Sequence, residues 1–194
     1  GDSVETKEVT AKLLEKRIIG LPHNIDKDIT DRIAAGIVGL NLESTEEIKL
    51  VIDSGGGKIK PAFRLIDLIK LSKAPVSGIV VGICGSAAIL ILQVCRKRLS
   101  TPHSRFFLHF VRSEFSYKAN QTRRDVMRSL AAHLKDTLTF QKDGEDLILS
   151  RVKISRNKLR RLMDDGERNG SELTSDEALE LGLIDEIVDE YDLL

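Results

Sequence analysis

The sequence has little cysteine and no excess of charge of either sign. Cys84 and Cys95 are the only cysteines among 194 residues, and no Cys/His spacing indicates a zinc site. Thirty basic residues balance thirty acidic ones, so no net charge attracts a nucleic acid or an anionic membrane surface. We therefore expect no metal and no nucleic-acid partner, and no motif indicates a cofactor.

Long hydrophobic runs are also missing. The longest lies around residues 87–92 and is far too short to span a bilayer, and no segment with the parts of a signal peptide opens the sequence. Together with the cysteine usage, this predicts a cytoplasmic protein without membrane association. A length of 194 residues with 41% hydrophobic residues suits one domain with a sizeable core, without internal repeats or linkers.

Short apolar runs alternate with helical patterns over most of the chain. The runs typical of strands are residues 18–21, 48–52, 75–81 and 98–100, and a run that contains His109. Helical patterns lie between them at residues 26–40, at residues 61–71, and from Ser86 onward. This alternation predicts crossover connections, a mainly parallel sheet and an α/β fold.

The remaining third of the chain is predicted to be mostly helical. Residues 122–149 carry apolar positions at helical spacing among many charges, which predicts one long amphipathic helix, with Gly144 as the point where it would break. Shorter helices are expected at residues 154–163 and 175–181, the last capped by Thr174 or Ser175. The polar segment 1–16 is expected to be flexible in part, ahead of a domain at 17–189 and a tail at 190–194.

A run of small residues at 82–88 contains the first candidate for chemistry, Ser86. It follows an apolar strand and precedes an apolar helix, so the order is strand, tight turn, serine, helix. Many hydrolases present a nucleophile in this way, and the N–H groups at the start of a helix attract negative charge. The alternative is that the small residues only allow a buried helix to pack closely.

Two further elements complete a possible hydrolase site. Gly55, Gly56 and Gly57 follow the strand at 48–52, and glycines there let bare backbone N–H groups approach a ligand, as an oxyanion hole requires. His109 interrupts a hydrophobic strand and offers a base. Each element alone has a structural alternative, a glycine-rich connection or a core histidine. Together they supply an amide donor, a nucleophile and a base in chain order.

Five segments resemble the ClpP-type caseinolytic proteases and their phage-type relatives, within the wider crotonase-like superfamily. These segments are residues 17–21 (the opening strand), 52–57 (similar to Asn-Ser-Pro-Gly-Gly), 82–88 (the small residues around the nucleophile), Leu108 with His109, and 176–185 (similar to the closing Glu-Ala-x-x-x-Gly-Leu-x-Asp signature). The resemblance covers roughly residues 17–189. It implies a fold of repeated β-β-α units with a mainly parallel sheet and a long projecting helix.

The resemblance also implies roles for individual residues and for partners. Ser86 would be the nucleophile, His109 the general base, and the backbone N–H groups of Gly57 and Ala87 the oxyanion donors. The chain would be one subunit of a homo-oligomeric ring, a heptamer or double ring. It would hydrolyse unfolded proteins or short peptides inside the chamber, together with an AAA+ unfoldase driven by ATP.

The acid of the catalytic triad has no clear counterpart. Alignment without a gap from the closing signature places Gly170 at its position, and one inserted residue places Asn169 there. An asparagine orients an imidazole but does not stabilise the imidazolium by charge. We therefore predict that Asn169 is the third member and that Asn169→Asp raises hydrolysis, with Asp164 and Asp165 as substitutes in a charged segment.

Three alternatives follow from these departures. Cys84, two residues before Ser86, is a second possible nucleophile. A crotonase-type acyl-CoA enzyme would need carboxylates in the pocket, and Asp53 is the only one beside the glycine motifs. A catalytically weak or inactive ring subunit would keep the fold and lack the acid.

Overall fold

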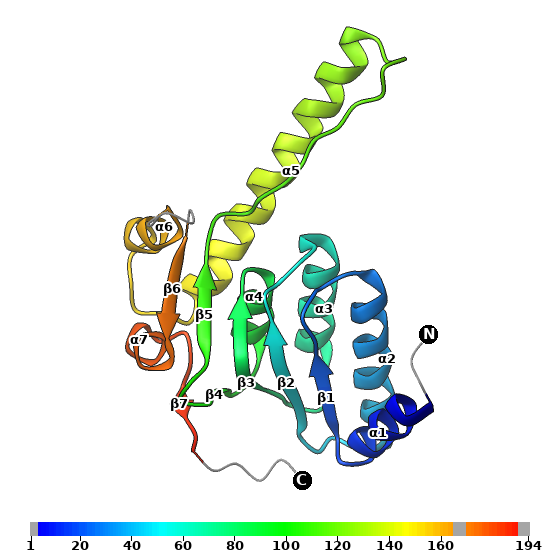
Figure 1. Ribbon diagram of the computed structural model, residues 1–194, viewed down its shortest axis with the longest axis vertical. Helices are drawn as coiled ribbons and strands as arrows, with labels where there is room; N and C mark the ends of the chain where they lie inside the picture. Colours follow the sequence, from blue (N-terminus) through cyan, green and yellow to red (C-terminus); the bar gives the residue numbers. More distant parts are fainter. Residues whose placement is uncertain (1–3, 165–169, 190–194) are drawn as a thin grey trace.

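A sheet of mostly parallel strands forms the body of the molecule, and one long helix projects from it (Figure 1). The computed structural model describes residues 4–164 and 170–189. Its elements in chain order are α1 (Val4–Glu15), β1 (Ile18–Leu21), α2 (Lys27–Glu43), β2 (Ile48–Ser54), α3 (Ile59–Leu71), β3 (Val76–Gly85), α4 (Ala87–Val94), β4 (Arg98–Ser100), β5 (Arg105–Leu108), α5 (Arg123–Leu149), α6 (Arg156–Asp164), β6 (Ser171–Thr174), α7 (Ser175–Leu181) and β7 (Glu186–Ile187).

The strand order confirms the predicted α/β class. Neighbouring strands follow the order β1-β2-β3-β4-β7, and β5 pairs with both β3 and β6. Every one of these pairs is parallel except β5 with β6, which is antiparallel. Parallel pairing needs crossover connections, and α2, α3 and α4 provide three of them.

The core lies between the sheet and the helices α2, α3 and α4, which stand side by side (Figure 1). In β2, Ile48, Leu50 and Ile52 are fully buried, whereas the residues between them are partly or fully exposed. This alternation directs one face of the strand toward the helices and the other face away from them. The inner positions of α2, among them Ile33 and Ile37, close the core from the other side.

Strand β3 is longer than the sequence predicts and changes partner along its length. Residues 78–80 pair with β4, whereas residues 83–85 pair with β5. The change occurs at Gly82, which has φ +97°, and there the Asp53 carboxylate accepts the N–H of Ile83 at 3.1 Å. The tight turn predicted at residues 82–85 is therefore wrong, because this bulge bends the strand without ending it.

Helix α5 runs unbroken from its capping residue Thr122 to Leu149. Gly144 does not break it. A Cβ at Gly144 would lie only 3.3 Å from Leu90, so the glycine lets α5 pack closely on α4. The irregular segment 110–121 runs from β5 alongside this helix to its outer end (Figure 1), and Ser113 hydrogen-bonds Thr137 at 3.0 Å.

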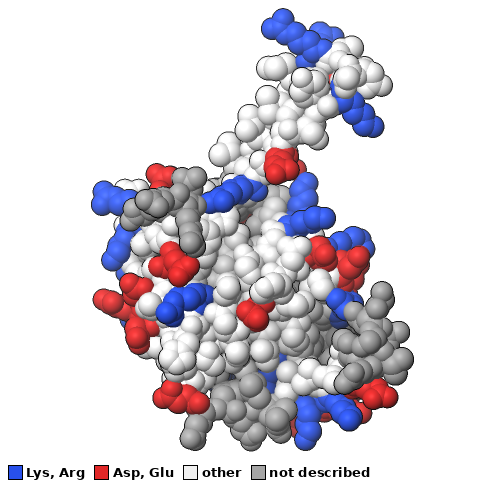
Figure 2. Space-filling model, viewed as in Figure 1, with Lys and Arg blue, Asp and Glu red and all other residues white. Residues whose placement is uncertain are grey.

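Within the segment 1–16, residues Val4–Glu15 form helix α1. Leu14 anchors it, because its side chain packs against the core beside Gly36 of α2. On the face seen in Figure 2, charges of both signs are scattered over the body, and basic side chains cover the tip of the projecting helix. Within the described residues, no helix has the length and apolar character needed to cross a membrane.

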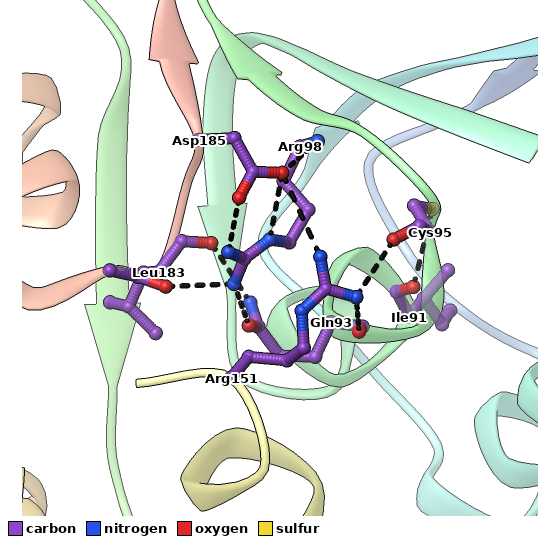
Figure 3. Close-up of polar contacts among 8 residues, drawn as sticks. Ile91, Gln93, Cys95, Arg98, Arg151, Leu183 and Asp185 are labelled. Carbon is purple, nitrogen blue, oxygen red and sulfur yellow. Dashed lines mark hydrogen bonds and ion pairs between the residues drawn. The ribbon is translucent and has the colours of Figure 1, made fainter. Parts of the chain in front are cut away.

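A polar cluster fastens the closing segment to the sheet (Figure 3). Arg98 in β4 is buried, and its guanidinium donates to Asp185 at 2.5 Å and to Gln93 at 2.7 Å. Gln93 in turn donates to the Leu183 carbonyl at 3.1 Å. Arg151 donates to the carbonyls of Gln93 and Cys95. We call these residues (Gln93, Arg98, Arg151, Asp185) the closing cluster.

Candidate active site

Ser86 lies at the carboxyl end of β3, directly before α4. Its backbone has φ 53° and ψ −123°, a combination rarely adopted by a residue with a side chain, and its N–H donates to the Phe107 carbonyl in β5 at 2.8 Å. Such a strained turn between a strand and a helix is how α/β hydrolases expose a nucleophile. The half-buried Ser86 therefore has the local geometry that a nucleophile requires.

The glycine segment after β2 packs directly against Ser86. A Cβ at Gly56 would lie 2.7 Å from the Ser86 Cβ and 3.0 Å from the Ala87 nitrogen. At Gly57 a Cβ would lie 2.3 Å from the Ile25 carbonyl oxygen, so neither position accepts a side chain. Within the described residues, the N–H groups of Gly57 and Ala87 donate no hydrogen bond. They are free to bind a ligand oxygen.

His109 directly follows β5 instead of interrupting the strand, which ends at Leu108. Because β5 is parallel to the last residues of β3, His109 and Ser86 follow the carboxyl ends of adjacent strands. The Gly55–Gly57 segment follows β2, which also pairs with the end of β3 through Ser54 and Cys84. Ligands of open α/β sheets bind at this edge, in the crevice outside the carboxyl ends of the strands.

The ring of His109 is held in one tautomer. Its Nδ1 lies 2.6 Å from the Phe110 carbonyl oxygen. A carbonyl oxygen only accepts hydrogen bonds, so Nδ1 carries the hydrogen and Nε2 of the neutral ring is unprotonated. Burial lowers the pKa of His109, and Arg112 lowers it further, while the bond to Phe110 raises it. The net pKa is below the ordinary value, so the neutral ring is available as a base.

Ser86, Ala87 and His109 border one small pocket. Its volume is about 30 Å³. The other lining residues come mainly from α4, α5 and the end of β5 and are mostly apolar: Ile59, Leu90, Leu108, Val111, Gln141, Gly144, Glu145, Ile148 and Met163. Among the described residues, no group of three His, Cys, Asp or Glu side chains is arranged to hold a metal.

The candidates for the triad acid fall in different places. Asn169 and Asp165 lie outside the described residues, and Asp164 is exposed at the end of α6. Gly170 packs against the histidine, because a Cβ there would lie 2.5 Å from the Leu108 carbonyl oxygen and 2.8 Å from the Cβ of His109. Position 170 therefore has no room for a carboxylate with this backbone.

The alternative residues do not face the pocket. The Cys84 side chain is fully buried among core residues, and burial raises the pKa of its thiol, which keeps it protonated. Asp53 uses one carboxylate oxygen for the N–H of Ile83, at the bulge of β3. These contacts give both residues structural roles.

Two residues at the pocket were missed from the sequence, Gln141 and Glu145 on α5. The Glu145 side chain is completely buried, and it accepts hydrogen bonds from Gln141, Arg156 and Arg160. The available signal was their spacing: Gln141 and Glu145 share the helix face of Leu138 and Ile148, where a polar residue interrupts the apolar stripe.

Comparison with known proteins identifies the family of this chain. The chain matches the Clp protease family over residues 1–191. It is also similar to the ATP-dependent Clp protease proteolytic subunit of Deinococcus radiodurans, with 28% identity over 193 residues that cover 98% of this chain and 89% of that protein. The chain therefore belongs to the Clp protease family.

Proposed function

We propose that this Clp protease family member is an active serine peptidase with Ser86 as the nucleophile and His109 as the general base. The observation that carries the proposal is the meeting of three strand ends: the strained Ser86 packs against Gly56, and Ser86 and His109 border one pocket. The neutral His109 ring, with Nδ1 protonated, leaves Nε2 to take the Ser86 proton.

In the proposed reaction the N–H groups of Gly57 and Ala87 bind the carbonyl oxygen of the scissile peptide bond. Ser86 Oγ attacks the carbonyl carbon while Nε2 of His109 takes its proton, and the negative charge gathers on the bound oxygen. His109 then gives the proton to the leaving amine as the C–N bond breaks. The acyl group remains bound to Ser86 as an ester. Water hydrolyses this ester by the same steps, with His109 again as the base.

We propose polypeptide substrates whose side chain at the cleaved bond is small and apolar. The pocket beside Ser86 has room for about two water molecules, and most of its lining is apolar. The name of the Deinococcus relative, an ATP-dependent proteolytic subunit, supports an ATP-driven partner that delivers unfolded chains.

We further propose that the subunits assemble into a homo-oligomeric ring or double ring, with α5 at a contact between subunits. Met127, Leu134 and Leu138 are exposed on this helix, although large apolar side chains are usually covered. Leu138→Glu should therefore reduce the assembled size measured by light scattering. A wild-type chain that stays monomeric over a wide concentration range would contradict this part of the proposal.

Labelling with a fluorophosphonate probe tests the catalytic proposal most directly, because the probe reacts only with an activated serine. We expect wild-type protein to be labelled at Ser86 and to hydrolyse a short fluorogenic peptide. Ser86→Ala and His109→Ala should each abolish both signals with similar losses, because nucleophile and base act as a unit. Normal turnover by Ser86→Ala would contradict the proposal, and loss of activity in Cys84→Ser alone would favour a cysteine nucleophile.

The second candidate is a ring subunit without activity of its own. The observation that favours it is the lack of an acidic side chain on the His109 ring within the described residues, where the Nδ1 partner is a peptide carbonyl. An unlabelled but folded and assembled wild-type protein would support this candidate.

A further inference from the structure

The peptide unit between Phe110 and Val111 is hydrogen-bonded on both sides. Its carbonyl accepts from Nδ1 of His109 at 2.6 Å, and its N–H donates to Oε1 of Gln141 at 2.6 Å. A peptide unit is a rigid plane in which these two groups point in opposite directions. The Gln141 bond on one side therefore controls where the carbonyl points on the other side.

Gln141 is itself fixed by a charge. Its Nε2 donates to Oε1 of Glu145, one helical turn further along α5, at 2.9 Å. Since a carboxylate only accepts, the NH₂ end of Gln141 must face Glu145, and its oxygen must face the Val111 N–H. The amide has a single orientation that satisfies both partners.

Glu145 keeps its negative charge although it is buried. Burial raises the pKa of Glu145, but hydrogen bonds from Arg160, Gln141 and Arg156 outweigh burial and lower the net pKa. Arg156 and Arg160 lie on α6 and donate to the carboxylate at 2.6 and 3.0 Å. Helix α6 thus anchors the carboxylate, and the carboxylate anchors Gln141.

All donors in this sequence of bonds point the same way, from His109 toward Glu145. Gln141 donates to Glu145, Val111 donates to Gln141, and His109 donates to the carbonyl of the same peptide unit. Aligned hydrogen bonds polarise one another, by roughly 10–30% per bond in condensed-phase estimates. The Phe110 oxygen therefore becomes a stronger acceptor than an isolated carbonyl.

We infer that Glu145 and Gln141 are positioning residues. They hold the Phe110 carbonyl oxygen against Nδ1 of His109, the ring nitrogen to which an acid binds in related triads. We call Glu145, Gln141 and this peptide unit the amide bridge. It selects the tautomer with a bare Nε2 and supports the positive ring that forms when Ser86 loses its proton. The catalytic role of these residues rests on the proposed function, whereas the assignment of the His109 tautomer does not depend on it.

Three variants test the amide bridge. Gln141→Met keeps the side-chain length and removes the hydrogen bonds to Val111 and Glu145. Glu145→Gln removes the charge and turns one of the two acceptor oxygens into a donor group. The matched control is Asp146→Asn, because Asp146 also pairs with Arg156 but has no bond to Gln141. The charged groups that act on the bridge and the ring are Arg112 beside His109, Glu145 on α5, and Arg156 and Arg160 on α6.

For peptide hydrolysis we expect Gln141→Met to lower kcat about tenfold, because the base is misaligned, with a smaller change in KM, because Gln141 also lines the pocket proposed for the substrate side chain. Glu145→Gln should lower kcat a few-fold. It should also move the acidic limb of the pH profile to lower pH, because losing a nearby negative charge lowers the pKa of His109. Asp146→Asn should match wild type in kcat and in pH profile.

Nitrogen NMR of labelled histidine supplies a readout that needs no activity, with His109→Gln used to assign the signal. We expect hydrogen on Nδ1 of His109 in wild type and in Asp146→Asn, and a tautomer mixture in Gln141→Met. Wild-type values of both tautomer and kcat in Gln141→Met would overturn the inference. Equal losses in Gln141→Met and the control would do the same, since they would indicate a structural role.

The two proposals fail separately. A wild-type protein without labelling or hydrolysis, but with the expected tautomers, would contradict the proposed function and leave the amide bridge supported. If Gln141→Met does not fold, Glu145→Gln decides: an unchanged titration of His109 in that variant overturns the inference.

Discussion

Two clusters of arginine and carboxylate side chains lie in different parts of the molecule and are hydrogen-bonded to different partners. In the closing cluster, the Arg98 guanidinium bonds Asp185, Gln93 and the Gly182 carbonyl, so that its hydrogen bonds connect only structural elements. In the cluster at the pocket, Glu145 accepts hydrogen bonds from two arginines and from Gln141. Gln141 in turn accepts the N–H of Val111, in the backbone beside His109. Each cluster is built on one deeply buried charge, Arg98 in the first and Glu145 in the second, so the last hydrogen bond of a network is a better guide to its role than the depth of that charge.

The largest effect is expected from Arg98→Leu in the closing cluster. The Arg98 side chain is only 5% exposed, and its loss leaves the Gln93 side-chain oxygen and the Gly182 carbonyl without this donor. Asp185 loses its guanidinium partner and keeps the backbone N–H of residue 98 and the ion pair with Arg151. Breaking a largely buried ion pair while leaving its partner in place typically costs several kcal/mol. Because Asp185 is partly exposed, we expect about 2–4 kcal/mol and a Tm lower by roughly 5–10 °C.

Thermal melts at one fixed protein concentration measure this change. The kcat per labelled active site should stay near that of wild type, because the closing cluster has no bond to the pocket residues. A large fall in kcat with an unchanged Tm would contradict the division of roles between the two clusters.

Gly170→Ala should act next, on the backbone around His109. The new Cβ would lie 2.5 Å from the Leu108 carbonyl oxygen and 2.8 Å from the Cβ of His109, so β5 or β6 must shift. Such overpacking costs about 1–3 kcal/mol, and we expect kcat to fall along with stability. Gly20→Ala in β1 is the matched control, because a Cβ there meets no atom within 4 Å and the residue lies outside the candidate site. If both alanine variants behaved alike, close packing at position 170 would not be the cause.

A smaller effect should appear in acid. The pKa of Asp185 and the pKa of Glu145 are both lowered, because hydrogen bonds from arginines outweigh burial at each site. Each carboxylate therefore stabilises the fold above its unfolded pKa near 4, and this contribution is lost as pH falls through the lower pKa of the folded state.

Denaturant unfolding at a series of pH values from about 6 down to about 2 measures the loss. Glu145→Gln should flatten the pH dependence of the unfolding free energy more than Asp185→Asn. The reason is exposure: the Glu145 side chain is 0% exposed, whereas Asp185 is 39% exposed and partly screened by water. An equal change in both variants would show that burial does not distinguish the two sites.

Local patterns explain what the sequence predicts well. The alternation in β2 and the apolar helix after Ser86 depend on near neighbours, and both elements form where they were expected. The course of β3 is different, because the bulge at Gly82 depends on the Asp53 carboxylate about thirty residues away. Gly144 stays helical for the same kind of reason, since Leu90 packs against it.

The candidate site shows the same difference between local sequence patterns and contacts that only the folded chain makes. Ser86, Gly57 and His109 occur in recognisable motifs, so their roles could be hypothesised from residues alone. Gln141 and Glu145 stand in an ordinary charged helix, and only the folded chain brings the backbone of residue 111 and helix α6 to them. Their spacing on one helix face is a sequence signal, but it does not identify the backbone group that Gln141 binds.

The smallest effect is expected at Asn169, and it separates two accounts of the third triad member. The hypothesis from the sequence gives Asn169 the hydrogen bond to His109 and predicts that Asn169→Asp raises hydrolysis, with a tenfold gain for each 1.4 kcal/mol of added stabilisation. In the amide bridge, Nδ1 of His109 already lies 2.6 Å from the Phe110 oxygen that accepts its hydrogen, so we expect kcat of Asn169→Asp to stay within about threefold of wild type. The decisive comparison is the double variant with Gln141→Met. If Asn169→Asp restores kcat only when the bridge is broken, the two groups compete for one ring nitrogen. A gain of tenfold or more in the single variant would instead assign the orienting role to residue 169.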